Sequence, residues 1–241
     1  MHFAFANPAA VLPFRLLPRK WVSFSGLVFG SMIPDFEFYI RMNAEAKFSH
    51  TIAGVFLFDL PAGIISLFIF YNIIANPLIE NAPQFLAARI SFLKNTDWNN
   101  YFKKNWIPVS VSIIVGAVLH IAWDNVTHEH GHFSGIIPGT TENFEILGIH
   151  FWRIHLLQHI STLLGGLIVG LYIWRLPVDV YYKPDISYKY WLVVAIISLV
   201  IIVLRLKLGF ETNVFYNIIV CVISAGMIAI TITPIILWRS K

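Results

Sequence analysis

The sequence predicts an all-α membrane protein, a multi-pass transmembrane helical bundle with five full spans preceded by a short helical hairpin or a sixth span. Apolar types make up 57% of the 241 residues and charged types only 12%, whereas soluble domains average about 45–50% and about 25%. Five apolar runs also reach or approach the roughly 20 residues that a helix needs to cross the hydrocarbon core. This composition excludes a secreted disulfide scaffold, a disordered regulator and an ordinary cytosolic enzyme.

The first expected element is a short hairpin over residues 8–34. Residues 8–17 and 22–33 are apolar but shorter than a span, and Pro18-Arg19-Lys20 between them has the composition of a turn. The second stretch ends at Pro34-Asp35, because proline disfavours helix in the residue before it and a carboxylate is unfavourable in lipid. Since no small-residue cleavage site follows, we expect this segment to be retained and not removed as a signal peptide.

Five full spans follow the hairpin, and several end in tryptophan or tyrosine, as interfacial anchors do. They cover residues 52–76, 106–127, 156–174, 190–204 and 214–238. The last two contain no acidic residue and no histidine. We therefore interpret residues 176–241 as two anchoring helices and residues 1–175 as the membrane-embedded domain with the polar site, both within one structural unit.

The charged residues predict an orientation and not a nucleic-acid interface. The net charge of +4 comes from 17 basic and 13 acidic residues in the connections between apolar runs, where basic residues set orientation or meet lipid head groups. If the turn near Arg19 lies opposite the 41–50 loop, twelve basic residues lie on one side and five on the other. The richer side is expected in the cytoplasm, so that the 77–105 connection is cytoplasmic and the 120–150 region faces away from it. The expected partner of this chain is the lipid bilayer, with no nucleic acid, and its single cysteine, Cys221, cannot form an internal disulfide.

Polar side chains converge at one predicted membrane face. His120, Asp124 and His128 repeat at i, i+4 spacing at the end of the third span, so all three can face the bundle interior. Because helix direction alternates, the ends of other segments lie at the same depth, and they carry Asp35, Glu37, His50, Gln158 and His159. A buried carboxylate among imidazoles must be paired, protonated or bound to a metal. Imidazole with carboxylate suits zinc, iron or manganese.

Weaker hypotheses attach to other residues. The loop 128–132 alternates histidine like a metal-binding tract, but a solvated loop is the favoured interpretation for His130 and His132. Asp59 stands in mid-span, about 13 Å deeper than His50 at helical rise, and we interpret it as a protonated, hydrogen-bonded acid. The sequence holds no P-loop, dinucleotide fingerprint, nucleophile elbow or zinc-protease motif.

Several motifs together resemble one family. They are HFAFANPAAVLP at residues 2–13, GSMIPDFE at 30–37, Ser49-His50-Thr51 with Gly54, HIAWD at 120–124 with Thr127, His128 and Gly131, and Gln158 with Ser161 and Gly165. Over residues 1 to about 170 the chain resembles the bacterial membrane family called domain of unknown function 4184. That family is in turn similar to YdjM-type membrane-bound metal-dependent hydrolases. The resemblance implies a multi-pass protein of the bacterial inner membrane with a metal site at the matching positions Asp35, His50, His120 and Asp124.

One position departs from the family pattern. Asn7 stands where the family has histidine before Pro-Ala-Ala, and an amide is a weaker ligand than imidazole for a transition metal. Either the amide oxygen serves, or another histidine replaces it, or metal binding is weaker in this chain. If the hairpin folds back, the Asn7 side chain points toward His120 and Asp124, and histidine at position 7 would tighten metal binding.

Three functions stay open on the sequence alone. The first is a hydrolase of a lipid-related or phosphate-ester substrate, in which a divalent metal at the four matching positions activates water. In it, Glu37 or His128 acts as general base or orients the site. The second is a non-catalytic membrane protein in which the same groups form a structural polar core or a metal-stabilised hairpin. The third is a transporter with Asp59 as an ion site, for which no internal repeat is visible.

Overall fold

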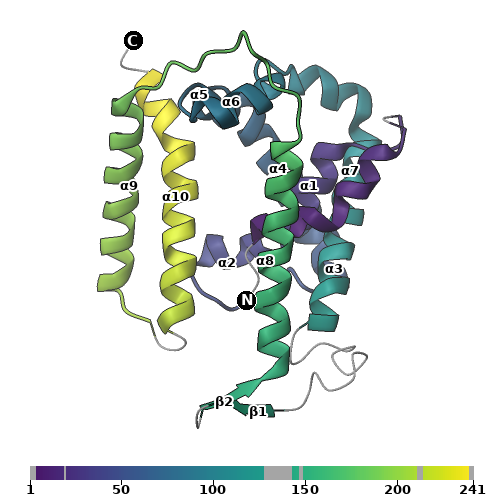
Figure 1. Ribbon diagram of the computed structural model, residues 1–241, viewed down its shortest axis with the longest axis vertical. Helices are drawn as coiled ribbons and strands as arrows, with labels where there is room; N and C mark the ends of the chain where they lie inside the picture. The colour runs from purple at the N-terminus through teal and green to yellow at the C-terminus, as the bar shows by residue number, and fades with distance from the viewer. Residues whose placement is uncertain (1–3, 19, 128–142, 147–148, 211–213, 239–241) are drawn as a thin grey trace. The chain divides into compact units, whose positions relative to one another are not determined.

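The chain is helical in a computed structural model that describes residues 4–18, 20–127, 143–146, 149–210 and 214–238 (Figure 1). Five of the described helical segments are long and apolar enough to cross a membrane, namely Ile52–Glu80, Trp98–Thr127, Leu156–Trp174, Tyr188–Lys207 and Val214–Leu237. The predicted class, a multi-pass helical membrane protein, is confirmed. A departure from the predicted elements is an antiparallel pair of short strands, β1 (Asn143–Ile146) and β2 (Ile149–Trp152), between the third and fourth spans.

The chain forms two compact units, and each is built from separate stretches of sequence. Unit 1 comprises Met1–Pro34, Phe48–Ile64 and Asn105–Leu171, and unit 2 comprises Asp35–Lys47, Ile65–Lys104 and Tyr172–Lys241. The helical run that starts at Ile52 and the one that starts at Trp98 each change unit along their length. The boundary expected near residue 175 stays a prediction.

The N-terminal hairpin of unit 1 consists of two short helices that pack against each other. The 3₁₀ helix η1 covers Ala4–Leu16 and the α-helix α1 covers Phe24–Met32. Pro8 and Pro13 lie inside η1, where each lacks the N–H that α-helical pairing requires. Because both helices are shorter than a membrane span, the sequence prediction of a hairpin is confirmed.

Glycines allow α1 to approach α7 (Trp98–Thr127) at backbone distance. A Cβ atom added at Gly30 would lie 2.3 Å from Ile113 O, and one added at Gly116 would lie 2.5 Å from Leu27 O. No side chain larger than hydrogen fits at either position without displacing backbone, which is the usual reason for small residues between membrane helices. The close approach brings the end of α1 beside the later turns of α7.

The first long span is one helical run with two wide turns. Its segments are α3 (Ile52–Gly54), the π-helical η3 (Val55–Asp59), α4 (Leu60–Ile69), the π-helical η4 (Phe70–Ile74) and α5 (Ala75–Glu80). Each wide turn comes just before a proline, Pro61 or Pro77. Proline donates no hydrogen bond and crowds the carbonyl four residues earlier, and a π turn relieves that crowding.

A bend in α7 separates its two ends. Asn105 has non-helical backbone angles, with φ −130° and ψ 27°, three residues before Pro108, and prolines are a common cause of such kinks. Beyond the bend, the unit 1 part of the helix carries His120 and Asp124 one turn apart. After the strands comes α8 (Arg153–Trp174), which belongs to unit 1 as far as Leu171.

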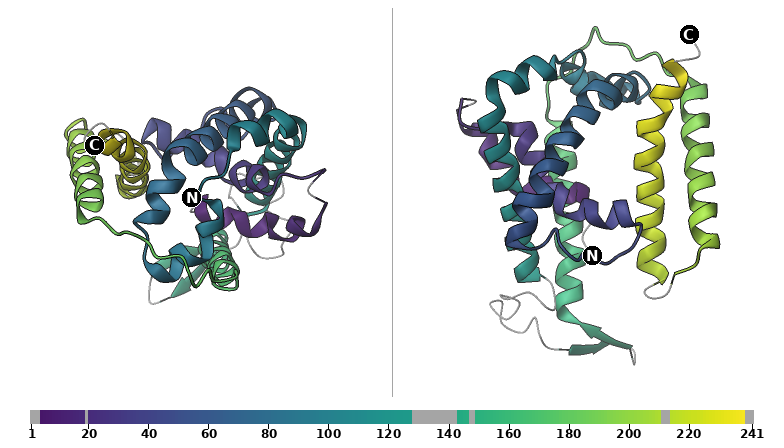
Figure 2. Two further views of the ribbon diagram at one scale, coloured as in Figure 1. Left: turned by 90° about the horizontal axis from the view of Figure 1, so that it is seen from above. Right: turned by 180° about the vertical axis from the view of Figure 1, so that it is seen from behind.

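Unit 2 contains the last two long helices. Its elements include α2 (Phe36–Arg41), which follows the short η2 (Ile33–Asp35), then α6 (Gln84–Ile90), η5 (Ser91–Leu93), α9 (Tyr188–Lys207) and α10 (Val214–Trp238). Both views of Figure 2 show α9 and α10 side by side, and Tyr190, Val194 and Ala229 are buried between them. Asn217 Oδ1 on α10 accepts a hydrogen bond from Ala44 N at 2.7 Å. The pair predicted to be anchors therefore also holds the loop after α2.

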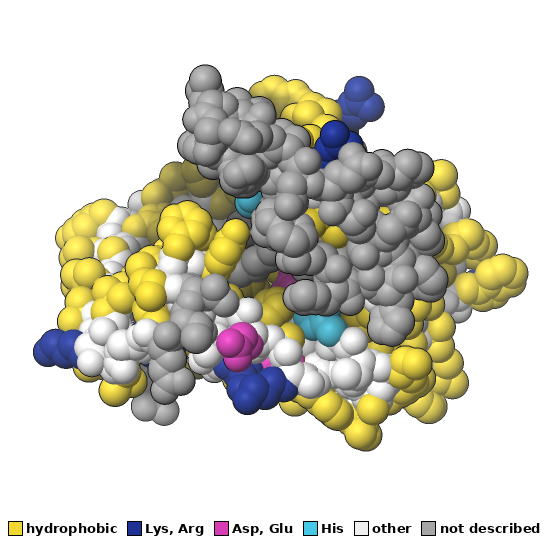
Figure 3. All heavy atoms as spheres, turned by 90° about the horizontal axis from the view of Figure 1, so that it is seen from below, with side chains coloured by type: hydrophobic (Ala, Val, Ile, Leu, Met, Phe, Trp, Pro, Cys, Tyr) yellow, Lys and Arg dark blue, Asp and Glu magenta, His cyan; other side chains and the backbone are white. Residues whose placement is uncertain are grey.

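Large apolar side chains are exposed along the long helices. Leu163 and Leu167 on α8 expose 73% and 57% of their surface, and Leu199 on α9 exposes 62%. Figure 3 shows many exposed hydrophobic side chains in one view, with charged side chains in small patches. Apolar surface of this extent on helices of this length is expected to contact lipid.

Candidate functional site

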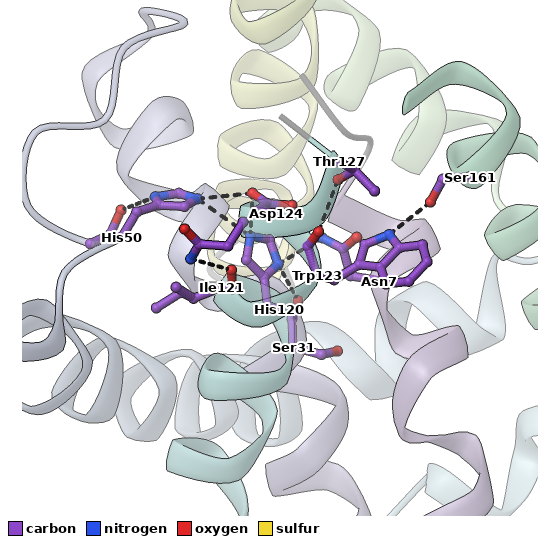
Figure 4. A network of polar contacts seen from close by, with 11 residues as sticks. Asn7, Ser31, His50, His120, Ile121, Trp123, Asp124, Thr127 and Ser161 are labelled. Atoms are coloured by element: carbon purple, nitrogen blue, oxygen red, sulfur yellow. Dashed lines mark hydrogen bonds and ion pairs between the residues drawn. The ribbon is translucent and has the colours of Figure 1, made fainter. Parts of the chain in front are cut away.

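Three side chains of unit 1 meet at one point (Figure 4). His50 comes from the loop before α3, and His120 and Asp124 come from α7. Asp124 Oδ2 lies 3.4 Å from His50 Nε2 and 3.3 Å from His120 Nε2, and the two Nε2 atoms are 3.4 Å apart. We name this set the His-His-Asp triangle. The predicted convergence of these three residues is thus observed.

Local structure explains how each residue reaches the triangle. His120 and Asp124 are four residues apart in α7, and that spacing places both on one helical face. Thr51 begins α3 as its N-cap, because its hydroxyl accepts from Gly54 N at 2.9 Å. His50 directly precedes this cap, so its side chain is held at the end of a span.

The triangle has a buried side and an accessible side. The His120 side chain exposes 1% of its surface, that of Asp124 13% and that of His50 25%. Within unit 1, His50 is therefore the most accessible member of the triangle and His120 the most buried one.

The outer nitrogens of both histidines contact oxygen atoms. His120 Nδ1 lies 2.9 Å from the backbone oxygen of Ser31, and since a carbonyl can only accept, Nδ1 donates. Ser49 Oγ lies 2.9 Å from His50 Nδ1 and can accept in the same way. With the proton on Nδ1, each Nε2 presents a lone pair to the triangle, which is the tautomer that metal-ligating histidines adopt.

This arrangement fits a metal ion. Two nitrogen lone pairs and a carboxylate oxygen repel one another at 3.3–3.4 Å unless a proton or a metal cation lies between them. In a tetrahedral site with zinc–ligand bonds of about 2.0–2.1 Å, neighbouring ligand atoms lie about 3.3–3.4 Å apart. The buried histidine and aspartate cluster could therefore bind a metal.

Asn7 points toward His120, as predicted, but it lies behind the ring. Its amide Nδ2 is 2.9 Å from His120 Nδ1, the nitrogen that faces away from the triangle (Figure 4). A nitrogen that donates to Ser31 cannot also accept from an amide N–H, so with Nδ1 protonated a half-turn of the Asn7 amide presents its oxygen instead. Asn7 thus contacts a histidine of the triangle, and its amide is not among the three groups of the triangle that could bind an ion.

Two further predicted residues belong to unit 2. Asp35 is its first residue, directly after Pro34, and is 2% exposed. Glu37 is also buried, and its Oε1 accepts from Lys47 N at 2.9 Å and from Arg41 Nη1 at 3.4 Å. These contacts hold the loop after α2, and a role of Glu37 as general base stays a prediction.

The remaining candidates are either outside the described residues or carried by other elements. His128, the other predicted catalytic residue, lies outside the described residues, as do His130 and His132. Asp59 is fully buried on the wide turn η3, and its proposed ion site stays a prediction. Gln158 is buried and His159 is exposed on α8.

Sequence reasoning missed the groups that orient the histidines. Ser49 is fully buried against His50, and only its position next to a histidine hinted at this role. The carbonyl of Ser31 has no side-chain signature at all. Trp123 Nε1 donates to Ser161 Oγ at 2.8 Å and joins α7 to α8, a contact between residues 38 positions apart that periodicity cannot predict.

Comparison with known proteins places the chain in a family. No curated protein and no solved structure matches it. A family model described as a domain of unknown function (DUF4184) matches residues 1–235, which extends the likeness beyond the first 170 residues. The chain therefore belongs to the DUF4184 family of domains of unknown function.

Proposed function

We propose that this chain is a membrane-bound, metal-dependent hydrolase whose ion is held by the His-His-Asp triangle. The observation that carries the proposal is the set of three acceptor atoms spaced 3.3–3.4 Å apart, two of them on histidines whose outer nitrogens contact oxygen. Zinc accepts such nitrogen and oxygen ligands in a tetrahedron, and catalytic zinc sites use three protein ligands and keep one position open. Iron and manganese are the alternatives.

Asp35 is proposed as a further ligand. It follows Ser31 by one helical turn, in the run formed by α1 and η2, and the backbone oxygen of Ser31 already contacts His120. Asp35 also occupies the position at which the family resemblance implies a metal-binding carboxylate. A second carboxylate would make the site more negative and increase its affinity for a divalent cation.

The residues around the triangle have separate roles in the proposed reaction. Ser31 O and Ser49 Oγ hold the imidazole rings so that both Nε2 atoms stay unprotonated. Asp124 supplies negative charge, and the partly exposed His50 side admits water. A divalent ion held by these residues would supply a bound water of lowered pKa and would polarise the scissile group. Glu37 and His128 remain the proposed proton acceptors, with a lipid-related or phosphate ester as substrate at the non-cytoplasmic face of a bacterial inner membrane.

Metal analysis of the purified protein tests the proposal. We expect about one transition-metal ion per chain in the parent, and a loss of about tenfold or more in Asp124→Ala and His120→Ala, because each removes a ligand. Asn125→Ala is the matched control, since Asn125 follows Asp124 and its amide donates to Ile121 O at 2.9 Å along α7. Its metal content should equal that of the parent.

Hydrolysis is then measured with phosphate-ester and ester-lipid substrates before and after chelation. Activity that disappears with the chelator and returns with zinc, iron or manganese supports the hydrolase. A folded parent that binds none of these metals would instead identify the triangle as a structural polar cluster, in which a proton on one imidazole replaces the ion.

A further inference from the structure

A groove of about 350 Å³ lies beside His120 within unit 1. Its walls come from η1, α7 and α8, elements far apart in the sequence. This volume is within the range of small-molecule sites, about 300–1,000 Å³. The groove is separate from the open side of the triangle at His50, since it adjoins the other edge of His120, where Asn7 lies.

The groove has a polar end and an apolar end. Asn7, His120 and Ser161 line the polar end, where Ser161 also accepts from an indole N–H. Leu164 and Ile168 line its continuation along α8. The helix rises about 10 Å from Ser161 to Ile168. The lining of the groove therefore changes from polar to apolar over a distance that a hydrocarbon chain can span.

The groove opens where lipid is the surrounding solvent. It runs along Leu156–Trp174, one of the segments that can cross a membrane. Leu164 and Ile168 are 53% and 48% exposed, so a chain can enter sideways from the bilayer. Apolar walls of this kind do not hold ordered water, which needs polar partners.

We propose that this groove binds the hydrocarbon chain of a membrane lipid and places the polar part of that lipid at Asn7 and Ser161, beside His120. Apolar walls that face a bilayer, a polar end at the candidate site and a length of about 10 Å all match an amphiphile that lies along α8. The inference rests on the proposed function in one respect: it makes the substrate of the hydrolase a chain-bearing ester lipid, whereas occupancy of the groove itself requires no metal.

The test is photo-crosslinking in lipid nanodiscs that contain a phosphatidylglycerol with a diazirine in its acyl chain. We expect labelling of α8 at the groove to saturate as the fraction of this probe rises. Leu164→Trp should reduce that labelling about tenfold, because the indole fills the groove. Leu163→Trp is the matched control: it adds the same ring one residue away, at a position that is 73% exposed and does not line the groove.

A second pair keeps the test decisive if Leu164→Trp does not fold. Ile168→Trp should also block labelling, and Leu167→Trp, at a 57% exposed neighbour, should not. Labelling that rises linearly with the probe and responds equally to both members of a pair would overturn the proposal, since that is the behaviour of unspecific boundary lipid.

Metal content measured on the same samples separates this inference from the proposed function. If labelling saturates and Leu164→Trp reduces it, but the protein binds no metal, the lipid groove is supported and the hydrolase is rejected. If the parent hydrolyses ester lipids, Leu164→Trp should slow that reaction and the control Leu163→Trp should not. Equal slowing by the two variants would reject the groove as the lipid site.

Discussion

At the scale of single residues, the chemistry of the site depends on which nitrogen of each histidine carries the proton. Ser31 O and Ser49 Oγ each contact an Nδ1 atom at 2.9 Å. The Nε2 atom of each ring is therefore the one that faces Asp124. Such outer contacts raise the basicity of metal-ligating imidazoles, and their loss commonly weakens metal binding by about 10–100-fold. The serine hydroxyl and the peptide carbonyl therefore perform the same task on the two rings.

Ser49→Ala tests this residue-scale argument. It removes the oxygen beside His50 Nδ1, and we expect metal affinity, measured by competition with a chelator, to fall about 10–100-fold. Ser31→Ala is its control, because the Ser31 hydroxyl donates to Val28 O at 2.8 Å while the backbone oxygen that contacts His120 is retained. Equal affinities of the two variants would show that the Ser49 hydroxyl does not orient the ring.

At the scale of elements, backbone contact between α1 and α7 determines where the site forms. Gly30 lies against Ile113 and Gly116 lies against Leu27, so two helices approach more closely than side chains normally allow. This proximity is what places the carbonyl of Ser31 within hydrogen-bond distance of His120. A larger residue at the contact would displace the helix and, with it, the Ser31 carbonyl that contacts His120.

Gly30→Ala is the corresponding element-scale variant. Its added Cβ would meet the backbone of Ile113 at 2.3 Å, so we expect a loss of about 1–3 kcal/mol in stability and reduced metal content. Gly166→Ala on α8 is the matched control, since no atom lies within 4 Å of its added Cβ and alanine favours helix. Thermal unfolding in detergent measures both variants, and a Gly30→Ala protein as stable as Gly166→Ala would argue against the close contact.

At the scale of the whole molecule, the asymmetry of basic residues predicts the orientation in the membrane. Twelve Lys and Arg fall on one predicted side and five on the other, and the positive-inside rule places the richer side in the cytoplasm. Under this prediction the loop after α2 faces away from the cytoplasm, and the connection between α8 and α9 faces it.

Cysteine labelling of intact cells checks the orientation in a Cys221→Ala background. Glu45 and Lys183 are exposed and lie in the two connections, and Cys221 is buried. An impermeant maleimide should label Glu45→Cys from outside, and Lys183→Cys only after permeabilisation. The opposite pattern would invert the topology and place the site toward the cytoplasm.

The sequence by itself determined the membrane class, the five spans, the N-terminal hairpin and the shared face of His120 and Asp124. Hydropathy, proline positions and i, i+4 spacing are local properties, and local sequence is sufficient to predict them. The strand pair β1 and β2 was not predicted from the same local patterns.

Only the tertiary structure decided which partners those local elements meet. That His50 reaches Asp124, that Asn7 lies behind His120, and that a groove opens along α8 all depend on helix packing between distant stretches of sequence. The physical reason is that glycine contacts and backbone carbonyls set these distances, and neither leaves a periodic signal in the sequence.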